Sequence, residues 1–349
     1  MGDWFEYGMV FMLVLYRQNT VLQSLMLSIT LFAYTGGSMD QTAEGTYRLL
    51  TRSDFDGLVC AVLLREKGLV DEITFVHPKD MQDGLIPVTD RDITTNLPYV
   101  PGVYLAFDHH VSETLRVGPQ ANHIIDPQAP SAARVVYDYY GGSQAFPAIS
   151  QEMMDAVDKG DSAQFTLDEV LNPQGWVLLN FIMDARTGLG RFKNFRISNY
   201  QLMMDLIDYC RDHSIEEILA LRDVKERVDL YFEHQNLFRE QLKRCAVVHE
   251  NVLVINLKDE DPIYAGNRFV KYALFPDTSV SIQIVWGFQR RNTVFSVGRS
   301  IFNRSSQVNI GELMLRYGGG GHAAAGTCQI DGQIEDEVLK DLIQSLHEE

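Results

Sequence analysis

Two short motifs contain residues that could hold a divalent metal ion. In "SDFDG", Asp54 and Asp56 are two residues apart at a turn, where both carboxylates can face one hard cation. In "DHH", Asp108, His109 and His110 follow an apolar run, and a carboxylate beside imidazoles suits Mn²⁺ or a similar ion. These residue types, placed after apolar segments, predict a metal site.

Each of these motifs also has a purely structural interpretation. D-x-D-G recurs in ordinary turns and calcium loops, and an aspartate beside a histidine can simply orient a core imidazole. Further along, "AVDKGDSAQF" places Asp158 and Asp161 at a predicted helix end, where either could be another ligand or a helix cap. The metal interpretation therefore depends on whether the fold brings these residues together.

A third motif, "GGGGH", could bind an anion. Its residues are Gly318, Gly319, Gly320, Gly321 and His322. Glycines let backbone N–H groups approach a phosphate, and a following helix would add its positive end; the alternative is a flexible turn between a helix and a strand. Arg299, at the end of a predicted strand, could grip the same phosphate or form a surface ion pair.

The elements that must position these motifs alternate between strand and helix patterns. Strands are predicted at 47–51, 72–78 and 102–108, and helices at 57–68 and 131–142. This alternation predicts a doubly wound parallel sheet, in which ligands bind beyond the carboxyl ends of the strands. Because both acidic motifs follow strands, we expect them to converge although they lie more than 50 residues apart.

The second half of the chain predicts a helical connector and a smaller domain. Apolar residues at helical spacing indicate one packed face, and they are Val224, Val228, Tyr231, Phe238 and Leu242. Strand patterns return at 251–257, 279–287 and 292–298, and a loop at 316–327 closes the region. The predicted organisation, with a crevice between two α/β domains, is 46–197, 198–245 and 246–346.

Composition narrows the class of protein. A chain of 349 residues with 46% hydrophobic residues can bury a large core, and a net charge of −17 argues against binding to duplex nucleic acid. A local basic pocket for a small anion remains compatible with that charge. Four cysteines far apart, without a C-x-x-C pair, predict neither a zinc ribbon nor a disulfide framework, which suits a reducing cytoplasm.

Residues 1–38 differ from the rest of the sequence. Their two apolar runs are interrupted at 17–20, and neither reaches the roughly 20 residues of a membrane span. Asp3 and Glu6 replace the basic start of a secretory signal. A membrane anchor, an extra helix and residues upstream of the true start codon are the three interpretations. We favour the last, since a polar lead-in follows Met39 directly.

Taken together, D-x-D-G, D-H-H, a later aspartate and a terminal G-G-G-H resemble the DHH/DHHA1 phosphoesterases. That superfamily includes RecJ-type exonucleases, nanoRNA and cyclic-dinucleotide phosphodiesterases and exopolyphosphatase-like proteins. The resemblance covers nearly everything after residue 46 and is strongest to the bacterial exopolyphosphatase-related branch. It implies an N-terminal DHH domain, the helical connector and a C-terminal DHHA1 domain.

The resemblance also implies roles for individual residues. The metal ligands would be Asp54, Asp56, His109 and Asp161. Asp108 and His110 would support and polarise the site, whereas Arg299 and the segment Gly318 to His322 would hold substrate phosphate. One or two Mn²⁺ or Mg²⁺ ions would polarise the phosphoryl group and lower the pKa of a water molecule.

Two positions depart from the family pattern. Many members have a histidine two residues before the first motif aspartate, where this chain has Arg52. Many also have a metal-bridging aspartate whose counterpart here is Asn96, or else Asp90 or Asp92 under a shifted alignment. Arginine cannot ligate a metal and an amide is a poor ligand, so one metal position is in question, and Arg52 could bind a substrate phosphate there.

The expected function is a cytoplasmic metal-dependent phosphohydrolase or phosphodiesterase that acts in the interdomain cleft. Its substrate would be polyphosphate, a short single-stranded oligonucleotide or a cyclic dinucleotide. Neither duplex nucleic acid nor a membrane is expected as a partner, and a homodimer is left open. The alternative is a phosphate or nucleotide sensor that kept the cleft and lost the chemistry.

Overall fold

A computed structural model of the chain describes residues 45–347. The prediction for residues 1–38 lies outside the described residues. Within the described part, no helix is both long and apolar enough to cross a membrane.

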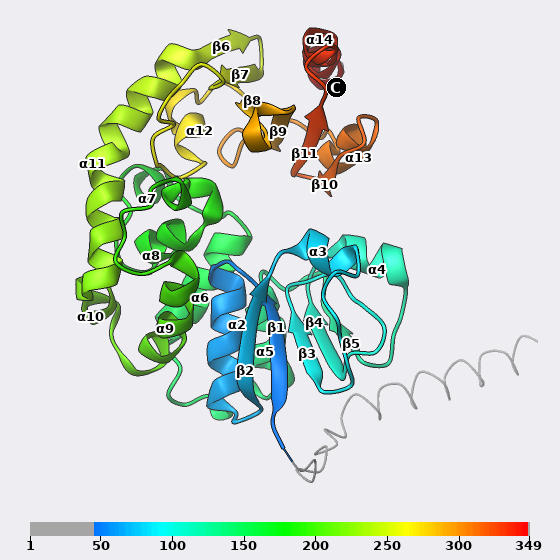
Figure 1. Ribbon diagram of the computed structural model, residues 1–349, viewed down its shortest axis with the longest axis vertical. Helices are drawn as coiled ribbons and strands as arrows, with labels where there is room; N and C mark the ends of the chain where they lie inside the picture. Colours follow the sequence, from blue (N-terminus) through cyan, green and yellow to red (C-terminus); the bar gives the residue numbers. More distant parts are fainter. Residues whose placement is uncertain (1–44, 348–349) are drawn as a thin grey trace, which may run out of the picture. The chain divides into compact units, whose positions relative to one another are not determined.

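The first sheet has five parallel strands in the order β2-β1-β3-β4-β5 (Figure 1). Their bounds are β1 Tyr47–Arg52, β2 Val70–Val76, β3 Asp92–Thr95, β4 Leu105–Asp108 and β5 His123–Ile125. Successive residues of β1 point to opposite faces, so Leu49 packs against α2 (Phe55–Glu66) and Leu50 against Met81 of α3 (Pro78–Gln82). Both faces are covered, which confirms the predicted doubly wound sheet.

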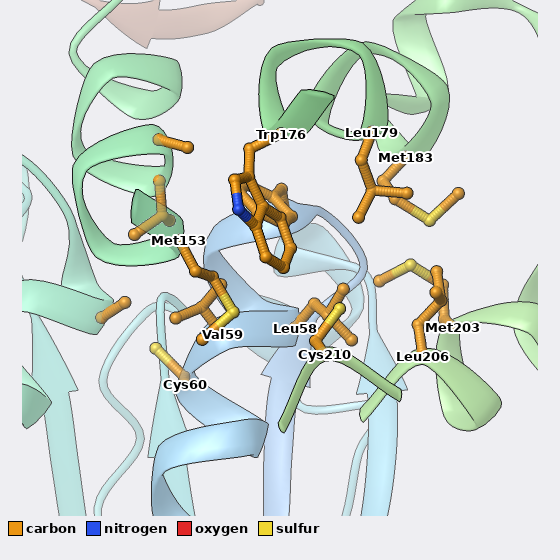
Figure 2. Close-up of a cluster of buried hydrophobic side chains, with 14 of the residues drawn as sticks. Leu58, Val59, Cys60, Met153, Trp176, Leu179, Met183, Met203, Leu206 and Cys210 are labelled. Carbon is orange, nitrogen blue, oxygen red and sulfur yellow. The ribbon is translucent and has the colours of Figure 1, made fainter. Parts of the chain in front are cut away.

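Helix α2 is the centre of the larger hydrophobic core. Every residue from Phe55 to Leu64 is buried. Leu58 and Val59 lie among side chains of the helices that follow, including Met153 and Trp176 (Figure 2). The other helices of this core are α5 Ala132–Tyr139, α6 Gln151–Asp161, α7 Leu167–Leu171, α8 Gly175–Met183 and α9 Asn199–Asp212, with short 3₁₀ turns at Gly142–Gln144, Ala185–Thr187 and Leu189–Arg191. Helix α4 (Val111–Val117) lies elsewhere, and its Val117 packs against a small separate cluster that includes Ala106. The two predicted helices in this half are confirmed as α2 and α5.

The predicted connector is helical, but it consists of three helices. After α9 come α10 (Ile215–Ala220) and α11 (Arg222–Cys245). Of the predicted packed face, Val228 is half-buried and the other four residues are buried. The amphipathic pattern therefore gave the correct face of α11.

The second sheet has six strands in the order β10-β11-β9-β8-β7-β6. Their bounds are β6 Ala246–His249, β7 Val252–Asn256, β8 Val280–Trp286, β9 Thr293–Arg299, β10 Gly320–His322 and β11 Ala325–Ile330. Helices α12 (Val270–Leu274), α13 (Ile310–Leu315) and α14 (Glu335–His347) and a 3₁₀ turn at Phe288–Arg290 complete this half. The three predicted strands are confirmed as β7, β8 and β9.

The two faces of β7 belong to different cores. Leu253 and Ile255 are part of the same core as α2 and α11, whereas Val252 and Val254 join a second core with α13 and α14. The larger core thus continues from the first sheet across the connector into the second sheet.

The predicted loop at 316–327 is wrong in part. Residues Gly320–His322 and Ala325–Ile330 pair as antiparallel strands β10 and β11, and helix α13 precedes the glycines rather than following them. Helix α13 and strand β10 approach closely, and this approach requires glycine at position 311, because a Cβ on Gly311 would lie 2.6 Å from the Gly321 carbonyl oxygen. Strand β10, with two glycines and a histidine, lacks the apolar alternation that predicts strands, and this explains why it was not predicted.

Candidate metal and phosphate site

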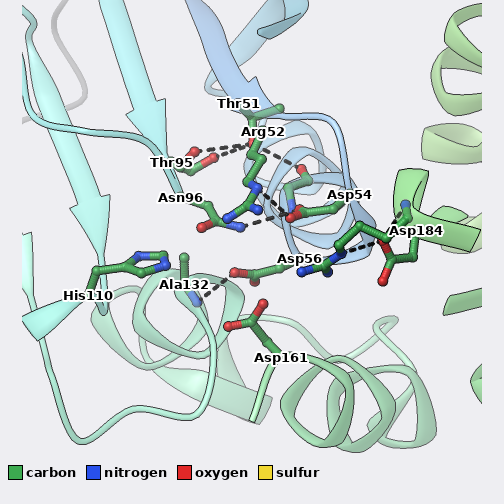
Figure 3. A network of polar contacts seen from close by, with 12 residues as sticks. Thr51, Arg52, Asp54, Asp56, Thr95, Asn96, His110, Ala132, Asp161 and Asp184 are labelled. Carbon is green, nitrogen blue, oxygen red and sulfur yellow. Dashed lines mark hydrogen bonds and ion pairs between the residues drawn. The ribbon is translucent and has the colours of Figure 1, made fainter. Parts of the chain in front are cut away.

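The predicted motifs converge at the carboxyl ends of β1, β3 and β4. Strand β1 lies between β2 and β3 in the sheet. The chain runs from β1 to β2 on one side and from β3 to β4 on the other side, so the loops after β1 and β3 diverge and leave a crevice between them. Thr95 Oγ1 donates to Thr51 Oγ1 at 2.7 Å and joins the two strand ends (Figure 3). The expectation that D-x-D-G and D-H-H meet at this edge is confirmed.

The D-x-D-G spacing places one aspartate outside helix α2 and one inside it. Asp54 is the N-cap and accepts a hydrogen bond from Gly57 N at 3.0 Å. Gly57 has to be glycine, because a Cβ there would lie 1.9 Å from the Arg52 carbonyl oxygen. Asp56, in the first turn, is 3% exposed and accepts from Ala132 N and Ala133 N at 3.0 and 2.8 Å, so the start of α5 fixes its carboxylate.

Three of the four predicted metal ligands come together. Donor atoms of Asp56, His109 and Asp161 all lie within 4.8 Å of one another. His109 Nδ1 is 3.1 Å from the Ala129 carbonyl oxygen, which fixes the proton on Nδ1 and leaves Nε2 to face the carboxylates. Nε2 lies 2.9 Å from Asp161 Oδ2, yet among the described residues it is buried without a hydrogen bond. Two carboxylates and a free imidazole nitrogen fit a divalent cation.

Without a cation, these ligands share protons. Burial would lower the pKa of His109, but Asp161 and Asp56 outweigh it and raise that pKa to about 9. Burial and the charge of Asp161 raise the pKa of Asp56 to about 7. Burial would raise the pKa of Asp161. The hydrogen bond and charge of His109 outweigh this effect and, with the charges of His110 and Arg52, lower that pKa to about 2. A bound cation would therefore replace protons on His109 and Asp56.

Asp108 organises the second histidine of D-H-H. Its Oδ1 accepts from His109 N at 2.8 Å and from His110 Nδ1 at 2.6 Å, so the Nε2 atom of His110 stays available to a ligand. Although burial opposes it, the bond to Asp108 raises the pKa of His110. Asp108 Oδ2 is buried without a hydrogen bond in the described part of the chain.

The glycine motif of the second sheet reaches this histidine. The rings of His110 and His322 stack with centroids 4.7 Å apart and an interplanar angle of 27°. Burial, with the charges of His110 and Arg52, lowers the pKa of His322 to about 4. Arg299 lies beside the motif, since its backbone N donates to the Ala324 carbonyl oxygen at 2.8 Å. The residues predicted for metal and for phosphate thus adjoin each other.

Comparisons with known proteins bear on this arrangement. No protein-family model matches the chain, and no curated protein does. Among solved structures, a pGpG-specific phosphodiesterase, PggH from Vibrio cholerae, is 62% identical over 86% of this chain and 99% of its own, with a TM-score of 0.75. RecJ from Thermus thermophilus in complex with Mn²⁺ is 13% identical over 86% of this chain and 52% of its own, with a TM-score of 0.47.

The chain belongs to the DHH/DHHA1 phosphoesterases. It is accordingly a DHH-type hydrolase, built from the mixed α/β architecture described above. The narrower expectation, the exopolyphosphatase-related branch, stays a prediction.

The two residues that depart from the family pattern, Arg52 and Asn96, both contact Asp54. Arg52 Nε lies 2.9 Å from Asp54 Oδ2, and Asn96 Nδ2 donates to Asp54 Oδ1 at 3.3 Å (Figure 3). Asp54 also caps α2, and it lies outside the group of three ligands. A carboxylate engaged by an arginine, an amide and a helix N-terminus does not fit a second cation.

Three other candidate aspartates lie elsewhere. Asp92 begins β3 at the far end of the strand and pairs with Arg48 at 2.7 Å, and Asp90 precedes it in an exposed turn. The shifted alignment is therefore wrong, and Asn96 is the residue that follows β3. Asp158 joins two helices rather than binding metal: it accepts from Ser131 Oγ at 2.7 Å and pairs with Arg134.

A group of polar residues beside the ligands was not predicted from the sequence. One pocket is lined by Asp54, Asp56 and Asp161 together with Asn180, Asp184, Arg186 and Arg268. Asp184 and Arg186 follow the apolar helix α8 directly, much as D-H-H follows an apolar strand. Polar residues directly after an apolar segment are a sequence signal that could have identified these two. Arg268 comes from the segment before α12 and had no comparable signal.

Proposed function

We propose that this DHH/DHHA1 protein hydrolyses the phosphodiester bond of a short linear dinucleotide such as pGpG. The observation that carries the proposal is the stacked His110–His322 pair beside the three metal ligands. It lets one phosphodiester contact the DHH motif and the glycine motif together. The identity of 62% to a pGpG-specific phosphodiesterase supports this substrate class over polyphosphate or a cyclic dinucleotide.

We further propose a single Mn²⁺ or Mg²⁺ ion, held by Asp56, His109 and Asp161. Such an ion would polarise the phosphoryl group and lower the pKa of a water molecule, as hydrolysis requires. Arg52 presents a fixed positive charge where other family members hold a second cation, and it can neutralise a nonbridging phosphate oxygen. His110 is oriented by Asp108, so its Nε2 can hydrogen-bond the reacting phosphate or the leaving oxygen.

The glycine motif can position the substrate from the other sheet. Strand β10 lies at the edge of its sheet, and side chains two residues apart point to the same face of a strand. Gly320 is two residues from His322, so an open backbone surface adjoins the stacked imidazoles. We also propose a cytoplasmic location, which four free cysteines support.

Turnover of a substrate panel tests the proposal. Purified full-length protein with Mn²⁺ should convert pGpG to mononucleotides faster than it degrades cyclic di-GMP, polyphosphate or a longer oligonucleotide. His109→Ala serves as the inactive control, because it removes a predicted metal ligand. Faster turnover of polyphosphate would reject the dinucleotide substrate. Tight binding of pGpG without turnover of any compound would instead support the sensor alternative.

A further inference from the structure

Two arginines approach one carboxylate in the pocket beside the metal ligands. Arg186 Nε lies 2.7 Å from Asp184 Oδ1, and Arg268 Nε lies 3.4 Å from Asp184 Oδ2. Arg186 follows α8, whereas Arg268 belongs to the segment before α12, so the pair joins two regions distant in sequence. The backbone supports this arrangement, because Gly266 N donates to the Thr187 carbonyl oxygen at 3.0 Å.

The charges of this arginine pair are not balanced locally. Asp184 is one carboxylate between two guanidinium groups, and its Oδ1 also accepts from Arg186 N at 2.9 Å. Arg268 Nε is buried and makes no hydrogen bond among the described residues. The neighbouring Asp56 and Asp161 belong to the proposed cation site and would be neutralised by its ion, and Asp54, which also lines the pocket, is paired with Arg52. One positive charge of the pair thus remains for an anion.

The pocket with the two arginines and the stacked histidines lie on different sides of the metal ligands. Figure 3 shows Asp184 and His110 on opposite sides of the carboxylates Asp56 and Asp161. The pocket lining includes neither His110 nor His322. Both arginines reach solvent, with side chains 50% and 28% exposed. A substrate with two phosphates could therefore span the metal ligands, with one phosphate near His110 and the other near the arginines.

We propose that Arg186 and Arg268 bind a second phosphate group of the substrate, the terminal phosphate of a phosphorylated dinucleotide. Arginine suits this role because its planar group of donors matches a phosphate in a two-bond geometry. Asp184 holds Arg186 in position before the ligand arrives. The inference rests on the proposed function and extends it, since it assigns the preference for a terminally phosphorylated substrate to named residues.

A comparison of pGpG with GpG tests the subsite, because the two compounds contain the same phosphodiester and differ in the terminal phosphate. The wild type should show at least about tenfold higher kcat/KM for pGpG. Arg268→Gln and Arg186→Gln should each lower kcat/KM for pGpG by about tenfold or more and leave GpG within about twofold. Glutamine keeps a polar hydrogen-bonding group while it removes the charge and shortens the side chain. Arg304→Gln, at an exposed position outside the pocket, is the matched control and should change neither value.

The outcomes separate the two proposals. An equal loss on both substrates would show that the arginines only support the fold or the catalytic step, and an unchanged preference for pGpG would also overturn the subsite. If the wild type cleaves neither compound, the proposed function fails. Calorimetric affinities of the same two compounds for wild type and Arg268→Gln then decide the subsite, which requires weaker binding of pGpG alone.

Discussion

Arg52 Nε and Asp54 Oδ2 lie 2.9 Å apart, so the arginine that departs from the family pattern forms an ion pair with the first aspartate of D-x-D-G. The same carboxylate receives hydrogen bonds from Asn96 and from the start of helix α2. Asp54 is thus engaged by an arginine, an amide and the start of a helix. We therefore expect Arg52 and Asn96 to determine how many metal ions the chain binds.

The first prediction is a change in metal stoichiometry. The wild type should bind one Mn²⁺ per chain, and the double variant Arg52→His with Asn96→Asp should bind two, because it supplies an imidazole and a carboxylate beside Asp54. Elemental analysis of dialysed protein measures this. Arg48→His changes an arginine in the same strand that pairs with Asp92 instead, and it should leave the stoichiometry at one. A double variant that still binds one ion would show that the region has been remodelled.

The second prediction distinguishes the two aspartates of D-x-D-G. Asp56→Asn and His109→Ala should each reduce Mn²⁺ occupancy and activity together by at least about tenfold, since both residues belong to the ligand group. Asp54→Asn should keep the ion, because asparagine is also a good N-cap and Asp54 lies outside that group. Loss of the ion from Asp54→Asn would make Asp54 a ligand and reject the assignment.

The third prediction concerns the pH dependence of metal binding. In the metal-free chain, His109 with a pKa of about 9 and Asp56 with a pKa of about 7 both hold protons at acidic pH. Since a ligand must lose its proton, Mn²⁺ affinity should be highest above pH 9 and fall about tenfold per pH unit from 9 to 7. The decline should steepen below 7. Calorimetry in buffers of different ionisation enthalpy counts the released protons, and release of none at pH 7.5 would contradict the prediction.

The fourth prediction separates substrate binding from metal binding at the glycine motif. Gly320 has open space around its Cβ position and no left-handed φ, whereas a Cβ on Gly319 would lie 2.1 Å from the Thr327 carbonyl oxygen. Gly320→Val should therefore fold normally and keep its metal, yet lower kcat/KM by at least about tenfold, because the side chain projects on the face of His322. Arg299→Ala should act in the same direction.

Gly332 provides a control for this variant, because its Cβ position is equally open and it lies outside the motif. Gly332→Val should leave kcat/KM and metal content unchanged. Normal kcat/KM in both Gly320→Val and Arg299→Ala would make the motif a structural turn only.

The convergence of D-x-D-G and D-H-H was predictable because it follows from topology alone. Both motifs come after parallel strands, and such strands end at one edge of a sheet. The use of Asp54 was less predictable, since one spacing serves a helix cap and a metal ligand equally well. The Asp158 side chain illustrates the same ambiguity: its contact with Arg134 depends on the packing of α5 against α6.

The arginine pair could not be predicted from local sequence. Arg186 lies in a 3₁₀ turn and Arg268 in a loop 82 positions later. Only the packing of α8 and the turn after it against the segment before α12 brings them to one pocket. The strand at Gly320–His322 was missed for another reason. Its residues have no apolar alternation, and its pairing depends on close backbone approach to α13 and β11.

The core shared by α2, α11 and one face of β7 limits how the protein can be divided. A fragment that stops at the end of α11 would lose Leu253 and Ile255 and expose the apolar surface they cover. The C-terminal half consequently cannot be exchanged between relatives as an independent domain by joining sequences at the end of α11. Any hybrid enzyme would have to transfer the matching face of α11 with it, and substrate preference in such hybrids would change together with thermal stability.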